Sequence, residues 1–166
     1  MIGKLNHVAI AVPDLDEASR IYKDVLGAKI SQPHALPEHG VTAVFVHLNN
    51  TNIELMQPLG DASTVRKFLE SHPKGGLHHV CYEVEDIFQA RDQLIAEGMT
   101  IVGDGEPYLG AHDRLVIFLH PKDFLGTLID LNNRVKLNQL NYGPKSNPRT
   151  NSEFTSIGAR RSGCHG

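Results

Sequence analysis

The sequence predicts an α+β protein built from two tandem βαβββ modules, and three observations support this fold class. Residues 5–12, LNHVAIAV, align without a gap with residues 77–84, LHHVCYEV, and the alignment places His7 on His79. Each stretch precedes a pattern typical of an amphipathic helix and then runs typical of strands. Each copy ends in a short apolar run that carries one carboxylate, as the segments NIELM and TLIDL show. This agreement indicates an internal duplication.

The helix of each copy is predicted from its capping residues and its apolar stripe. Aspartate can accept hydrogen bonds from the free N–H groups at a helix start, and glycine is common just past a helix end. In the first copy these residues are Asp14 and Gly27, and the apolar stripe between them consists of Leu15, Ala18, Tyr22 and Val25. In the second copy they are Asp86 and Gly98, with the stripe Ile87, Ala90 and Leu94.

Apolar runs predict the later strands of each copy. The first copy has VTAVFVHL at 41–48 and NIELM at 52–56, and the second has RLVIFLH at 114–120 and TLIDL at 127–131. The carboxylates of the two copies lie further apart than the histidines, so the second copy carries a small insertion near 121–126. The copies are connected by a short helix and a glycine-containing turn, predicted at 64–71 and 73–76.

These elements define one domain over residues 1–131, with the first module at about 4–60 and the second at about 76–131. The remaining segment, 132–166, is rich in Asn, Ser, Gly and Arg and has few large apolar residues. Such a composition cannot bury enough apolar surface to offset the entropy of ordering, so we expect a disordered polar tail.

The composition is that of a globular protein, with 40% hydrophobic and 21% charged residues among 166. No apolar run is long enough to cross a bilayer. The net charge of −3 and the absence of tryptophan give no reason to expect nucleic-acid binding. The two cysteines, Cys81 and Cys164, are not expected to pair, which favours a reducing compartment. No secretory signal or Arg-rich presequence is recognised.

Strand alternation turns the repeat into a prediction of a metal site. His7 and His79 should each project from the less apolar face of a strand, and Glu54 and Asp130 from the face opposite the apolar layer. Two imidazoles and two carboxylates can surround a divalent cation such as zinc, cobalt, nickel, manganese or iron. His78 should point to the opposite face and have a structural or supporting role.

The quoted motifs resemble a known family. Two such modules, with a ligand on the first and last strand of each, resemble the vicinal oxygen chelate superfamily. Within it the chain is most similar to the methylmalonyl-CoA epimerases, especially the animal forms. The stretches that carry this resemblance are KLNHVAIAVPDL (4–15), YKDVLGAK (22–29), PEHGVTAVFV (37–46), IELMQPLGD (53–61), GGLHHVCYEV (75–84), LGAH (109–112) and IFLHPKD (117–123).

The resemblance implies a curved, half-open barrel-like mixed sheet around a metal site, and a homodimer. It implies that a divalent ion, Co2+, Mn2+, Ni2+ or Zn2+, is held by His7, Glu54, His79 and Asp130. The family ordinarily has glutamate at the fourth position, and this chain has the shorter Asp130. The implied reaction interconverts (R)- and (S)-methylmalonyl-CoA through abstraction of the C2 proton.

Inversion needs a proton-handling group on each side of C2. Asp130 is the first candidate, and Glu54, its counterpart in the repeat, is the second. Other candidates for the second group remain open, namely His112, Glu38 and His39. Some bacterial relatives have a glutamate where this chain has Ala43, so that assignment does not carry over. His112, Lys122 and Arg114 are expected to contact the substrate.

The same superfamily includes three other kinds of protein, which serve as alternatives to the epimerase. A glyoxalase I-like lyase shares the four-ligand site, whereas extradiol dioxygenases leave more of the metal open, which disagrees with a ligand at Glu54. A metal-free small-molecule binding protein is compatible with the change at Asp130. The resemblance to animal forms implies the mitochondrial matrix, and a bacterial source would imply the cytoplasm.

Overall fold

The computed structural model describes residues 1–110 and 113–139. Its strands are β1 (Ile2–Ala11), β2 (Lys29–Ile30), β3 (His34–Leu36), β4 (Val41–His47), β5 (Asn52–Pro58), β6 (Gly76–Val84), β7 (Tyr108–Leu109), β8 (Leu115–Leu119) and β9 (Ile129–Asn133). The α-helices are α1 (Leu15–Arg20), which continues as a π-helical turn over Ile21–Val25, α2 (Thr64–Ser71) and α3 (Ile87–Ala96). Single 3-10 turns lie at Pro37–His39, Pro121–Asp123 and Leu137–Gln139.

The strands form one mixed sheet in the order β2-β4-β5-β1-β6-β9-β8-β7, with β3 paired to β4. In the first module β1 lies parallel to β5, and in the second β6 lies parallel to β9. The modules meet where β1 pairs antiparallel with β6. The strand order of one module is therefore repeated in reverse by the other, which confirms the predicted α+β fold of two related halves.

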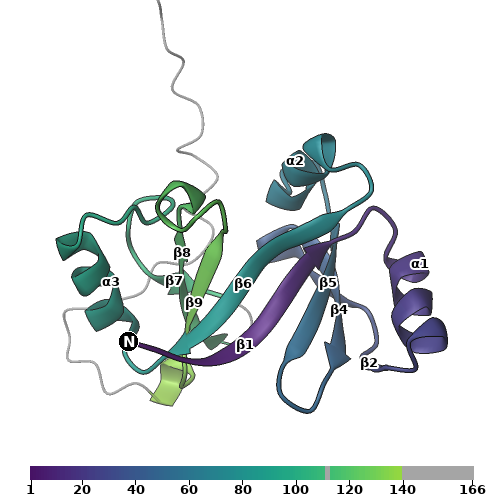
Figure 1. Cartoon of the computed structure of the whole chain (residues 1–166), viewed down its shortest axis with the longest axis horizontal. Coiled ribbons are helices and arrows are strands. Elements are labelled where there is room, and N and C mark those ends of the chain that lie inside the picture. The colour runs from purple at the N-terminus through teal and green to yellow at the C-terminus, as the bar shows by residue number, and fades with distance from the viewer. Residues whose placement is uncertain (111–112, 140–166) are drawn as a thin grey trace, which may run out of the picture.

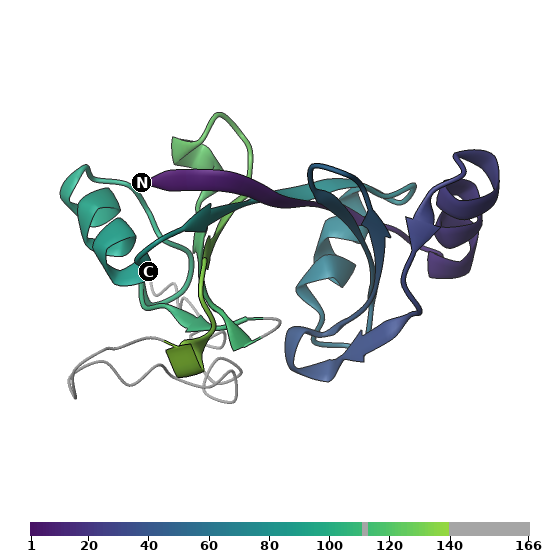
Figure 2. The same cartoon turned by 90° about the horizontal axis from the view of Figure 1, so that it is seen from below.

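The sheet is strongly curved and does not close (Figure 1). Seen from below, its two halves stand as walls on either side of an open concave space, and β1 and β6 run across the top (Figure 2). Helices α1 and α3 lie on the outer sides of the two walls, and α2 lies on the inner side of the first module. No helix in the described part of the chain is both long and apolar enough to cross a membrane.

The predicted strand faces are confirmed by the packing. The outer core of the first module joins Ile10 of β1 and Leu55 of β5 to Leu15 of α1. The outer core of the second joins Leu131 of β9 to Ile87 of α3. The inner face of the first module is covered by α2 through Val65, Phe68 and Leu69, which pack on Ala9, Ala11 and Met56. Each module thus has an apolar outer layer, and polar side chains occupy the inner face beyond the part that α2 covers.

Two of the register shifts between β1 and β6 lie directly before the two histidines that the repeat aligns, His7 and His79. Leu5 pairs with Tyr82 and His7 with Cys81, so Asn6 is an extra residue on β1. In the other copy Ala9 pairs with His79 and Ile10 with Leu77, so His78 is an extra residue on β6. Such β-bulges redirect a side chain, and here they occupy equivalent positions of the two copies.

The bulge overturns one expectation from strand alternation. His78 was expected to point away from the face of His79, but its Nδ1 lies 2.9 Å from Nδ1 of His79. Neighbouring side chains on a regular strand cannot meet in this way because they leave opposite faces. The additional residue in the strand removes that restriction.

The expected start of the tail at residue 132 is also wrong for its first residues. Strand β9 continues through Asn133, which is fully buried and whose Oδ1 accepts a hydrogen bond from the backbone N–H of Ile87 at the start of α3. Leu137 packs on the outer core of the second module. The polarity of these residues reflects helix capping rather than disorder. The rest of the predicted tail, 140–166, lies outside the described residues.

Candidate active site

The four residues predicted as metal ligands lie on four adjacent strands at the centre of the sheet. The strand order β5-β1-β6-β9 corresponds to the residue order Glu54, His7, His79, Asp130. Each module supplies one histidine from its first strand and one carboxylate from its last strand. The two histidines lie in the middle, and the two carboxylates approach from opposite sides.

Three of these side chains meet directly. Nε2 of His7 lies 3.2 Å from Nε2 of His79 and 3.4 Å from Oε2 of Glu54. One ligand atom of each of the three lies within 4.8 Å of the others. The histidine rings are nearly perpendicular, with an interplanar angle of 76°. Three atoms that bind cations therefore face one another in a small volume.

Asp130 joins the same group through His7 and Cys81. Ligand atoms of His7, Cys81 and Asp130 also lie within 4.8 Å of one another. Cys81 and Asp130 pair across β6 and β9, which brings the thiol beside the Asp130 carboxyl group. Oδ1 of Asp130 is buried and has no hydrogen-bond partner among the described residues. The shorter aspartate thus still reaches the site, and it brings an acceptor that lacks a donor.

Burial changes the proton affinity of the whole group. Glu54 is only 7% exposed, and burial together with the negative charge of Asp130 raises its pKa to about 7. Burial likewise raises the pKa of Asp130 to about 7, although the Cys81 thiol partly opposes this change. Burial and the neighbouring His7 hold the pKa of His79 well below its usual range. The carboxyl groups are therefore poised near neutral pH, and His79 is held neutral.

These donors fit a divalent metal ion. The site gathers two neutral imidazoles and two carboxylates, and an uncompensated pair of buried carboxylates is costly without a cation. Imidazole nitrogen and carboxylate oxygen together suit zinc, cobalt, nickel or manganese. The unpartnered Oδ1 of Asp130 is consistent with such a ligand role.

An aromatic wall borders the site on the side of the second module. The ring of Phe118 lies edge-on to His79 at 5.4 Å between centroids. Tyr108 stacks on Phe118, and burial, together with the negative charge of the nearby Asp130, raises the pKa of its hydroxyl. Sequence reasoning missed Tyr108 because β7 is only two residues long. Cys81 was given no role in the site, although strand alternation places it on the same face as His79.

The other described residues predicted for the site are not among the groups of side chains that could hold a metal ion. Arg114 forms an ion pair with Glu83, with Nη1 3.5 Å from Oε1. Lys122 is exposed in the turn between β8 and β9. Glu38 and His39 pair with each other at 3.8 Å in the turn before β4. His112 lies outside the described residues, so its predicted contact with substrate stays a prediction.

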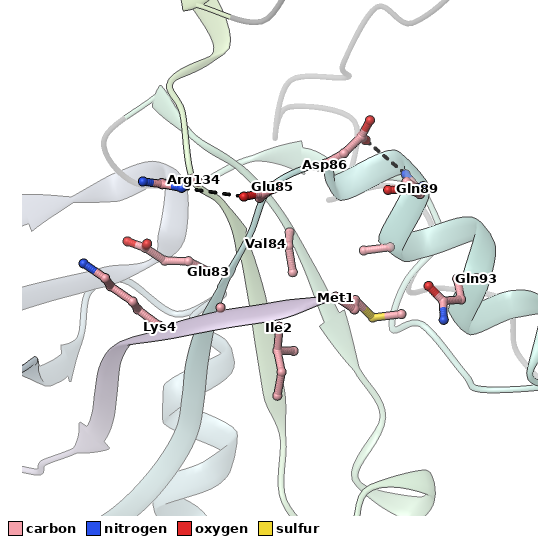
Figure 3. A pocket seen from close by; sticks show the side chains of 12 residues that line it. Met1, Ile2, Lys4, Glu83, Val84, Glu85, Asp86, Gln89, Gln93 and Arg134 are labelled. Carbon is pink, nitrogen blue, oxygen red and sulfur yellow. Dashed lines mark hydrogen bonds and ion pairs between the residues drawn. The ribbon is translucent and has the colours of Figure 1, made fainter.

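A surface groove lies elsewhere on the second module. It runs between the start of β1, the end of β6 and α3, and its lining includes Met1, Lys4, Glu83, Gln93 and Arg134 (Figure 3). None of the four candidate ligands lines it. Its charges are mixed, since Arg134 faces Glu85 across it. The groove is therefore separate from the candidate active site.

Comparison with known proteins identifies the family of the chain. A family model described as the glyoxalase/bleomycin resistance protein/dioxygenase superfamily matches residues 6–118. The ethylmalonyl-CoA/methylmalonyl-CoA epimerase of Cereibacter sphaeroides is 56% identical over 131 residues, which cover 79% of this chain and 98% of that protein. The chain belongs to the methylmalonyl-CoA epimerase family. A second member, the mitochondrial methylmalonyl-CoA epimerase of Homo sapiens, is 49% identical over 130 residues, or 78% of this chain and 73% of that protein.

Solved structures of the methylmalonyl-CoA epimerase family share the fold. A selenomethionine form of methylmalonyl-CoA epimerase is 36% identical and superimposes with a TM-score of 0.72 over 82% of this chain and 98% of that chain. The enzyme from Mycobacterium tuberculosis is 29% identical, with a TM-score of 0.73 over 81% and 89% of the two chains. The superfamily, the fold and the resemblance inferred from the sequence are thereby confirmed.

Proposed function

We propose that the protein interconverts (R)- and (S)-methylmalonyl-CoA by moving the proton at C2. The observation that carries this proposal is the placement of two buried carboxyl groups on opposite sides of a histidine pair. Glu54 comes from β5 and Asp130 from β9, and two strands separate them in the sheet. An epimerase needs one proton-handling group for each face of the carbon, and this arrangement supplies both. The epimerases among its relatives support the same reaction.

The proton chemistry follows from the burial of the two carboxyl groups. A general acid or base works best when its pKa lies near the operating pH. In the metal-free protein burial raises the pKa of Glu54 and of Asp130 to about 7, so either group can take or return a proton at neutral pH there. In one direction Asp130 removes the C2 proton and Glu54 delivers a proton to the other face; in the reverse direction they exchange roles.

The histidines and carboxylates would also hold the cofactor. His7, Glu54, His79 and Asp130 are the residues proposed to bind a divalent ion, with Co2+, Mn2+, Ni2+ or Zn2+ as candidates. When bound, the ion supplies positive charge beside the thioester oxygen on which negative charge develops. The stacked rings of Phe118 and Tyr108 border this site on the side of the second module.

The proposal is tested by proton exchange. Methylmalonyl-CoA is incubated with the protein in D2O, and C2 is followed by NMR with and without a chelator. We expect deuterium uptake far above the spontaneous background, loss of uptake with the chelator and recovery when cobalt is added back. A double variant, Glu54→Gln with Asp130→Asn, serves as the matched protein without either base. If the wild-type protein takes up deuterium no faster than this variant, the proposed reaction is wrong.

Two further attributes stay proposals. A homodimer is inferred from the family resemblance, and light scattering at several concentrations would measure it. The mitochondrial compartment is inferred in the same way, whereas the relatives include a bacterial protein as well as mitochondrial ones. Fractionation of the source cells would decide between them.

A further inference from the structure

Each candidate ligand histidine is held by the bulged residue that precedes it. Nδ1 of His7 lies 2.9 Å from Oδ1 of Asn6, and Nδ1 of His79 lies 2.9 Å from Nδ1 of His78. The extra residue in each strand is what brings these neighbouring side chains together. The same device therefore occurs twice, once in each module, with asparagine in one copy and histidine in the other.

We propose that Asn6 and His78 are positioning residues that fix the rings of His7 and His79 with their Nε2 atoms turned toward the metal site. A histidine that binds a metal through Nε2 needs the proton on Nδ1, and an acceptor for that proton sets both the tautomer and the ring angle. Asn6 and His78 each place an acceptor there. This inference rests on the proposed function, because it concerns the metal site of that function.

The orientation of Asn6 is fixed from behind. Its Nδ2 donates to Oε1 of Glu83 at 2.9 Å, so the amide nitrogen faces Glu83 and Oδ1 faces His7. An amide oxygen only accepts, so His7 must carry its proton on Nδ1 and present a lone pair at Nε2. Arg114 in turn contacts Glu83 at 3.5 Å. The Arg114–Glu83 pair thus holds Asn6, which is the anchor of His7. Glu83 also lines the surface groove in Figure 3.

His78, which is the anchor of His79, is held by packing on helix α2 rather than by an ion pair. The ring of His78 lies edge-on to Phe68 of α2, with 5.1 Å between centroids. Phe68 itself stacks on His72. In this position Nδ1 of His78 can accept the Nδ1 proton of His79. Because the δ atoms of asparagine and histidine are both attached to Cγ, the two anchors present their acceptors at matching distances from the backbone.

Calorimetric titration of the metal-free protein with CoCl2 measures cobalt binding. It therefore tests the positioning role of Asn6 and His78 independently of turnover. His78→Phe keeps a ring beside Phe68 but removes the acceptor. Asn6→Leu keeps a branched side chain of similar size beside His7 and likewise removes the acceptor. We expect each variant to bind cobalt about 10- to 100-fold more weakly. His78→Asn should bind within about threefold of wild type, because it copies the anchor that the first module uses. His34→Phe, at an exposed histidine of β3, is the matched control and should bind like wild type.

A second readout measures the tautomer itself. In 15N-histidine NMR of the zinc-loaded wild-type protein, His7 and His79 should both carry the proton on Nδ1, and His78→Asn should preserve this pattern. Circular dichroism and thermal unfolding establish that each variant is folded before it is titrated. Wild-type affinity in His78→Phe, or an equal loss in His78→Asn and His78→Phe, would overturn the inference while leaving the metal site intact. A wild-type protein that binds no cobalt would overturn the metal site of the proposed function as well.

Discussion

The two-sided arrangement of Glu54 and Asp130 predicts that each carboxyl group serves one epimer. Glu54 lies on β5 and Asp130 on β9, outside the two histidine strands, so a substrate carbon bound between them would have one base on each face. The isosteric variants Asp130→Asn and Glu54→Gln each remove one base. We expect each variant to lose epimerisation but to exchange the C2 proton of one epimer, because the remaining base still removes and returns a proton on its own face.

The size of the effect follows from the role and the burial of these groups. A positioned general acid or base contributes about 10²- to 10⁴-fold to the rate, so turnover of either variant should fall by that factor. Burial raises the pKa of Asp130 to about 7, so the metal-free site favours a protonated carboxyl group. An amide cannot hold that proton, so pH adjustment should not restore the variant.

The assay uses each pure epimer in D2O and follows both deuterium uptake and configuration. We expect Asp130→Asn and Glu54→Gln to label opposite epimers and to invert neither at a rate near wild type. Asp61→Asn, at an exposed carboxylate, controls for the loss of one negative charge and should behave as wild type. If both variants label the same epimer, or if either inverts at the wild-type rate, the two-base arrangement is refuted.

Three other predictions concern the ligand set and the fold. Asp130→Glu, which restores the residue usual in the family, should keep or raise the turnover that Asp130→Asn loses; a steady-state assay that finds all three proteins equal would remove Asp130 from the chemistry. Cobalt affinity should weaken as the pH falls below about 7, because Glu54 and Asp130 then bind protons that the ion must displace, whereas His79 is already neutral. Up to two protons are displaced, so the affinity should fall by about 10- to 100-fold per pH unit well below pH 7. Calorimetry in buffers of different ionisation enthalpy measures that proton release, and an affinity that is flat from pH 5 to 8 would contradict the raised pKa values. Asn133→Ala should lower the free energy of unfolding by about 1–3 kcal/mol, because it leaves the buried N–H of Ile87 without its acceptor. Urea denaturation measures this loss, Asn49→Ala in the exposed turn between β4 and β5 is the control, and equal midpoints would show that the cap contributes nothing.

The parts of the fold that repeat were predictable from the sequence. A match at His7 and His79 fixed the alignment of the two copies, and strand alternation then placed Glu54 and Asp130 on the inner face. The helix caps Asp14 and Asp86 were also found, and each accepts hydrogen bonds at its predicted helix start. These features were accessible because each depends on local spacing, and the second copy provided an independent check.

The features that were missed depend on contacts between distant segments. The bulge at His78 leaves no mark in the alternation pattern, because it appears only when β6 pairs with β1. The polar residues after Leu131 resembled a tail, although Asn133 caps α3 from 46 positions away. The pairing of Arg114 with Glu83 was likewise invisible, so Arg114 was expected to contact substrate. In each case a polar side chain satisfies a partner that sequence spacing does not indicate.

The duplication also explains why the site is asymmetric although its scaffold is not. The two inner faces had to diverge, because α2 covers that of the first module through Phe68 and Leu69 and requires small apolar residues such as Ala9 and Ala11 beneath it. The positions equivalent to these two alanines in the second module are Cys81 and Glu83, which are free to take polar roles. Cys81 contacts the Asp130 carboxyl group, and Glu83 holds Asn6, the anchor of the opposite module. The polar face of one half thus orients candidate ligands from both halves, so we expect neither module to form this site alone.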